Sequence, residues 1–112
     1  MKQQCIVIAL IYSGRPDPRW ELSDEQREHF FNYWNDAILS GTEVRQSTSS
    51  GYRGTRLVTP EKSYLIYNEI ITCFEKTARV SKKDEERKME IFLLNSAPKE
   101  IAVLLERAHV PK

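Results

Sequence analysis

Three apolar segments, separated by polar stretches, predict the strands of a sheet. Residues 4–12 (QCIVIALIY) are β-branched and apolar without alternation, which is typical of a central strand covered on both faces. Residues 52–58 (YRGTRLV) predict a second strand, with a weak point at Gly54 that fits a β-bulge. Residues 63–75 (SYLIYNEIITCFE) predict one long strand, interrupted by a polar Asn-Glu pair. We expect the last two segments to form an antiparallel hairpin.

Helical periodicity occurs in three other places. After Ser23, which opens a capping box (SDEQ), apolar residues recur at three- and four-residue spacing. They define the expected buried face of a first helix: Phe30, Phe31, Trp34, Ala37 and Ile38. Gly41 is the expected left-handed stop of this helix. A second helix is expected around residues 89–94, after a charged stretch, and a third over residues 98–109 (PKEIAVLLERAH).

These elements follow one another in the order β-α-β-β-α-α. Helices that cover a mostly antiparallel sheet form a two-layer α+β fold, and we expect a single domain over residues 1–112. The alternative takes residues 101–105 (IAVLL) as a strand, which would give the ferredoxin-like order βαββαβ. The apolar spacing of this segment fits a period of 3.6 better than 2, and helix-forming residues flank it. We therefore favour the helix.

Composition narrows the function classes only a little. The formal net charge is +1, so attraction to nucleic acid or to a membrane has to come from local patches. Cys5 and Cys73 lie far apart in apolar segments, which predicts buried reduced thiols. The spacing of residues indicates no metal site, no phosphate-binding glycine loop and no cofactor. Without a recognisable cleavage site or membrane span, we expect a cytoplasmic protein with no membrane partner.

The most distinctive short stretch is SGRPDPRW, residues 13–20, between the first strand and the first helix. Its prolines favour an extended path, and we expect Trp20 to fill the seam between sheet and helix. The sequence reveals no structural role for Arg15, Asp17 or Arg19, and a rigid loop presents such side chains at low entropic cost. The stretch resembles an SGRPxPxW string in short bacterial proteins of no assigned activity. The resemblance implies a shared fold element and no function.

The sequence supports three functional hypotheses. The first is a small non-enzymatic module that binds a protein partner, with the candidate binding residues Arg15, Asp17, Arg19, Trp20, Arg53 and Arg56. The second is weak binding of nucleic acid or a phosphate ligand by basic residues within 45–56 and 76–88, although the aromatic motif of an RNA-recognition motif is missing. The third is a small enzyme that uses His29 or His109, which requires one of them to line a pocket beside a nucleophile or a carboxylate.

Overall fold

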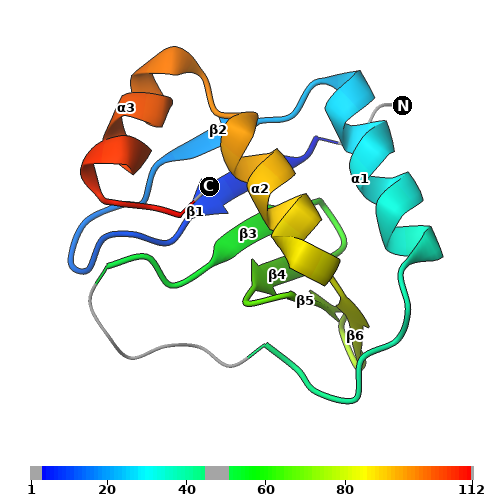
Figure 1. Ribbon diagram of the computed structural model, residues 1–112. Coiled ribbons are helices and arrows are strands. Elements are labelled where there is room, and N and C mark those ends of the chain that lie inside the picture. The colour runs from blue at the N-terminus through cyan, green and yellow to red at the C-terminus, as the bar shows by residue number, and fades with distance from the viewer. Residues whose placement is uncertain (1–3, 45–50, 112) are drawn as a thin grey trace.

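The computed structural model describes residues 4–44 and 51–111, which form three helices and one six-stranded antiparallel sheet (Figure 1). The strands are β1 (Ile6–Ala9), β2 (Arg19–Glu21), β3 (Thr55–Val58), β4 (Ser63–Tyr67), β5 (Ile70–Phe74) and β6 (Arg79–Lys83). Their order in the sheet is β2-β1-β3-β4-β5-β6. The helices are α1 (Asp24–Asp36), α2 (Lys88–Asn95) and α3 (Lys99–Arg107), and a 3-10 turn, η1 (Glu85–Arg87), precedes α2. The expected α+β class is confirmed.

The described chain contains more strands than the sequence pattern indicates. The prediction of one strand over residues 63–75 is wrong, because Asn68 and Glu69 form a two-residue turn between β4 and β5. Their φ angles are 51° and 68°, and two consecutive left-handed residues are typical of a type I′ turn, which suits the twist of a hairpin. The charged stretch after β5 first forms β6, and the end of the SGRPDPRW stretch contributes the short edge strand β2.

The expected pairing of the central strands is confirmed, including the weak point at Gly54. β1 lies between β2 and β3, and β3 pairs with β4 as an antiparallel hairpin. The Leu10 backbone donates to the Gly54 carbonyl at 3.0 Å and accepts from the Arg53 N–H at 2.8 Å, so two residues face one, as in a β-bulge. The φ angle of Gly54 is 123°, and a Cβ atom here would come within 3.2 Å of the Tyr67 Cβ. Glycine is therefore required.

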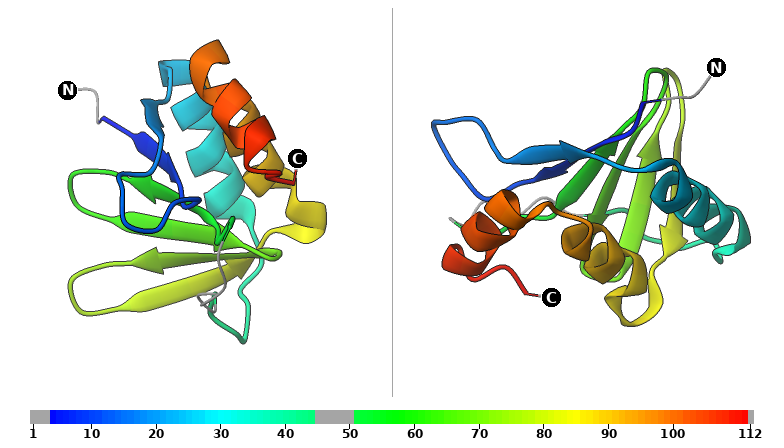
Figure 2. Two further views of the ribbon diagram at one scale, coloured as in Figure 1. Left: turned by 90° about the vertical axis from the view of Figure 1, so that its left-hand side faces the viewer. Right: turned by 90° about the horizontal axis from the view of Figure 1, so that it is seen from above.

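The core lies between the inner face of the sheet and the helices, which Figure 2 shows on one side of the sheet. Along β1 and β3 the buried side chains alternate, and the inner face of the sheet includes Val7, Leu57 and Tyr64. The rings of Phe30 and Trp34 from α1 pack edge-on against Tyr64, with centroids 5.0 and 5.4 Å away. The two cysteines are buried reduced thiols, as expected, and burial raises the pKa of each.

The helices differ from expectation mainly at their ends. The capping box at Ser23 is present, but α1 ends at Asp36 rather than near Gly41. The chain leaves the helix to meet the edge of β6, where the Lys83 N–H donates to the Ile38 carbonyl at 2.8 Å. Ile38 is consequently 63% exposed instead of buried. Residues 101–105 lie within α3, which excludes the ferredoxin-like alternative. Within residues 4–44 and 51–111, no helix has the length and apolar character needed to cross a membrane.

Candidate functional site

The SGRPDPRW stretch contains most of the connection between β1 and β2 and the first two residues of β2. Two of its residues fix the geometry of this hairpin. The Asp17 carboxylate accepts hydrogen bonds from the backbone N–H groups of Ile11 and Tyr12, at 2.9 and 2.7 Å. Trp20 is 6% exposed on the inner face of β2, and its indole N–H donates to the Ser96 hydroxyl at 2.8 Å. Trp20 therefore fills the seam between sheet and helices, and Asp17 has a structural role that the sequence does not reveal.

The four candidate arginines come together in two pairs. The Arg15 guanidinium lies over the Tyr12 ring, 3.8 Å from its centroid, and Arg53 donates to the Tyr12 carbonyl at 2.6 Å. Arg19 on β2 and Arg56 on β3 both stand opposite Ile8 of β1. Because neighbouring strands lie about 4.8 Å apart, the Cα atoms of Arg19 and Arg56 are separated by roughly 10 Å.

Arg19 and Arg56 lie on the sheet face that points away from the helices. Side chains alternate along a strand, so the positions between the buried residues of β1 and β3 face this outer side. We call the surface at its β2-β1-β3 end the arginine face. It is made of the half-exposed Ile6, Ile8, Arg56 and Val58 and the exposed Arg19, and the exposed Glu21, opposite Ile6, borders it. Among residues 4–44 and 51–111, neither arginine takes part in an ion pair. Two guanidinium groups thus flank an apolar strip.

The connection from α1 covers the other end of the outer sheet face. The Ser40 N–H donates to the Ser81 carbonyl at 2.8 Å, and the Val44 N–H donates to the Thr72 hydroxyl at 3.0 Å. The side chains of Thr72 and Ser81 are buried beneath this connection. Residues 45–50, which contain Arg45 of the nucleic-acid hypothesis and most of the polar loop, lie outside the described residues.

A second feature, which sequence reasoning missed, is the buried carboxylate of Asp84 at the corner between β6 and α2. Asp84 is 0% exposed, and its oxygens accept hydrogen bonds from the backbone N–H groups of Met89 and Glu90, at 2.8 and 3.0 Å. It also accepts from the Tyr33 hydroxyl at 2.8 Å. Asp84 therefore caps α2, because it accepts hydrogen bonds from N–H groups in the first turn of this helix. Asp84 and Lys88, which are four residues apart, form no ion pair with each other.

Glu90, one turn into α2, is the second buried acid. It is 0% exposed and accepts hydrogen bonds from the Tyr52 hydroxyl at 2.5 Å and from Arg87 Nε at 3.2 Å. Burial and the adjacent Glu90 carboxylate raise the pKa of Tyr52, so its hydroxyl stays protonated and donates. In the sequence this segment, KKDEERKME, has the composition of a solvated helix, and periodicity cannot reveal that two of its acids are buried.

Around this corner lies a cavity of about 430 Å³, which we call the polar cleft; it is lined by Tyr52, Tyr67, Asn68, Arg87, Glu90, His109 and Pro111. His109 thus meets one condition of the enzyme hypothesis, since it lines a cavity beside a carboxylate. Both oxygens of Glu90 are already engaged, however, and the lining includes no serine, threonine or cysteine. Glu90 is therefore held in the cleft as the hydrogen-bond acceptor of Tyr52 and Arg87. His29 lies elsewhere, on α1, with its ring 4.4 Å from that of Phe92.

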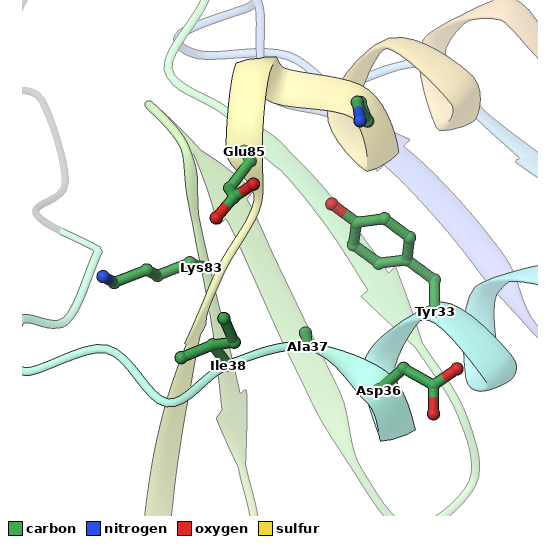
Figure 3. Close-up of a pocket in the computed structure, with 7 residues that line it drawn as sticks. Tyr33, Asp36, Ala37, Ile38, Lys83 and Glu85 are labelled. Carbon is green, nitrogen blue, oxygen red and sulfur yellow. The ribbon is translucent and has the colours of Figure 1, made fainter.

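A smaller cavity of about 260 Å³ lies between the end of α1 and η1 (Figure 3). The Tyr33 ring borders it on one side, and the exposed Ile38 lies on another. Two lysines and two acids complete most of its lining: Lys83, Lys88, Asp36 and Glu85. The lining thus carries two positive and two negative side chains.

Comparisons with known proteins identify no relative: no family model, no curated protein and no solved structure matches the chain. Within the described parts of the chain, no group of three or more His, Cys, Asp and Glu side chains is placed to hold a metal ion.

Proposed function

We propose that the protein is a non-enzymatic binding module whose arginine face recognises an acidic segment of a partner protein. The observation that carries the proposal is the pair of arginines, Arg19 and Arg56, on either side of Ile8 on an outer sheet face without helices. A guanidinium binds a carboxylate through two parallel hydrogen bonds, and arginine is enriched at protein interfaces. The apolar side chains between the two arginines supply area that a partner can bury.

The spacing of the arginines indicates the kind of segment that fits. Their Cα atoms are roughly 10 Å apart, and an extended chain rises about 3.3 Å per residue. Side chains of an extended segment alternate between its two sides, so acidic residues four positions apart share a side and lie about 13 Å from each other. Two such residues, with an apolar residue midway, would reach both flexible arginine side chains and cover Ile8. Because Arg19 and Arg56 have no ion pair within residues 4–44 and 51–111, binding would not require breaking one.

Binding of nucleic acid has less support, because several of the expected basic residues are already engaged. Arg79 pairs with Glu43 at 3.3 Å, and Arg87 pairs with Glu90. The Lys82 ammonium donates to the Trp34 carbonyl at 2.8 Å and lies 4.5 Å from the centroid of the Trp34 ring. The arginine face, moreover, carries aliphatic side chains where a single-stranded nucleic acid would need exposed aromatic rings.

Short synthetic peptides with two glutamates flanking an apolar residue, at several spacings, test the proposal by NMR titration. We expect the amides of β1, β2 and β3 to shift, and the Arg19→Ala/Arg56→Ala double variant to bind about tenfold more weakly or worse. Glutamine versions of the peptides should not bind, and Arg107→Ala, an exposed change on α3, should leave binding unchanged. The proposal fails if no acidic peptide shifts these amides, or if the double variant binds equally well. Binding of DNA, but not of peptides, by the same arginines would also contradict it.

A further inference from the structure

The polar cleft brings together segments that are far apart in the chain. Tyr67 and Asn68 come from the β4–β5 turn, Arg87 from η1, and His109 from the segment after α3. The volume of about 430 Å³ is within the range of small-molecule sites, which runs from roughly 300 to 1,000 Å³. None of these residues belongs to the arginine face.

The backbone at one side of the cleft is strained. Glu86 and Arg87 have φ angles of 57° and 59°, and the left-handed conformation is sterically unfavourable for residues other than glycine. Neighbouring groups hold this conformation: Glu86 N–H donates to the Glu69 carboxylate at 3.0 Å, and Arg87 N–H donates to the Asp84 carbonyl at 3.0 Å. Residues that their surroundings hold in such rare backbone conformations are found most often at functional sites. Its effect here is to direct the Arg87 side chain along the cleft toward Glu90.

The hydrogen-bonding groups of the cleft fall into two sets. In the first set, Glu90 uses both carboxylate oxygens, and Arg87 uses Nε for Glu90 and Nη2 for the Pro111 carbonyl, at 3.2 and 3.0 Å. In the second set, the side chains of Tyr67, Asn68 and His109 have no hydrogen-bond partner within residues 4–44 and 51–111, and neither does Arg87 Nη1. Every group of the second set can donate a hydrogen bond. Glu90, the one carboxylate that lines the cleft in the described part of the chain, is occupied.

We propose that the polar cleft binds a small oxyanion, either a carboxylate or a phosphoryl group. Arg87 provides the charged donor, and Asn68, Tyr67 and His109 add donors from the facing segments. Glu90 and Tyr52 act as positioning residues, because they fix the guanidinium through its Nε. The negative charge of Glu90 offsets the positive charge of Arg87. The preference of the site for an oxyanion therefore comes from its number of hydrogen-bond donors rather than from a net positive charge.

Two substitutions remove ligand groups without disturbing the backbone. Asn68 and His109 both have positive φ angles, 51° and 56°, which glycine adopts more easily than they do. His109 also follows the end of α3 in a Schellman motif, in which its N–H donates to the Glu106 carbonyl and the Val110 N–H to that of Leu105. The variants Asn68→Gly and His109→Gly should therefore fold at least as stably as the natural chain.

NMR titrations of the full chain with inorganic phosphate and with acetate, at ionic strength matched by chloride, test the site. We expect saturable shifts of the Asn68, Arg87 and His109 amides, and a loss of affinity of about tenfold in the Asn68→Gly/His109→Gly variant. Arg107→Ala, two residues before His109 and outside the cleft, serves as the matched control and should bind normally. A response to one anion alone supports the site and identifies its ligand class.

Three results would overturn the inference. The first is the absence of saturable shifts at the cleft with both anions. The second is an equal response to acetamide, the neutral counterpart of acetate, because it would show that an oxyanion is not recognised. The third is unchanged affinity in the glycine double variant while its melting temperature shows that it is folded. Each is independent of the peptide experiment on the arginine face.

Discussion

At the scale of single residues, the SGRPDPRW stretch contains side chains that stabilise the fold and side chains that remain exposed. Trp20 and Asp17 point into the structure, where one fills the seam and the other fixes the hairpin backbone. Arg19 remains exposed, and Arg15 rests on the Tyr12 ring. The burial of Trp20 follows from its position before a capping box and could be predicted. The role of Asp17 could not, because its partners depend on how β1 and β2 pair.

Trp20→Ala should lower the free energy of unfolding by about 3–5 kcal/mol, since it removes a large buried ring and the hydrogen bond to Ser96. Trp20→Phe should cost less, because the phenyl ring keeps much of the buried area and loses mainly the indole N–H. Urea denaturation of both variants measures the difference. A cost below about 1 kcal/mol for Trp20→Ala, the level of a surface change, would contradict the burial of this side chain.

At the scale of elements, the corner between β6 and α2 depends on one side chain. α2 starts from Arg87 in a left-handed conformation, and Arg87 provides no side-chain cap. Asp84 instead reaches forward to the N–H groups of Met89 and Glu90. A cap so far from the helix start, across two left-handed residues, has no short sequence signature like that of the Ser23 capping box. The local pattern therefore identifies the start of α1 and misses that of α2.

Asp84→Ala should destabilise the fold by about 2–4 kcal/mol, because it leaves two N–H groups of α2 and the Tyr33 hydroxyl without their acceptor. Chemical denaturation and hydrogen exchange of the Met89 and Glu90 amides measure this effect. The neighbouring Glu85→Ala, an exposed change, should stay within about 0.5 kcal/mol. Equal losses in the two variants would show that Asp84 has no special role as a cap.

At the scale of the whole molecule, three tyrosines make the free energy of unfolding depend on pH in the alkaline range. Burial, first of all, raises the pKa of Tyr33, Tyr52 and Tyr64 above the ordinary value of 10. Below pH 10 the folded and unfolded chains both keep these protons. Above it the unfolded chain releases protons that the folded chain retains, so the free energy of unfolding falls as pH rises. The cysteines, with pKa values raised from 9.0, act in the same direction.

We expect this fall to reach about 1.4 kcal/mol per pH unit for each tyrosine that stays protonated in the folded chain. Urea denaturation at several pH values from about 8 to about 11 measures the slope. Tyr52→Phe should reduce this slope by about 1.4 kcal/mol per pH unit, which corresponds to one proton, whatever the substitution does to stability at neutral pH. A slope that does not change in this variant would show that Tyr52 ionises equally in both states.

The sequence by itself determines the features that depend on neighbouring residues. The period of 3.6 over residues 101–105 makes α3 a helix, the SDEQ stretch starts α1, and unbroken apolar runs place the two thiols inside. Only the tertiary structure decides that the 63–75 segment folds back on itself, because a left-handed turn depends on the pairing around it. It also decides which polar groups find partners. Asp84 and Glu90 are buried, and Arg19 and Arg56 face outward on either side of Ile8, because distant segments meet there.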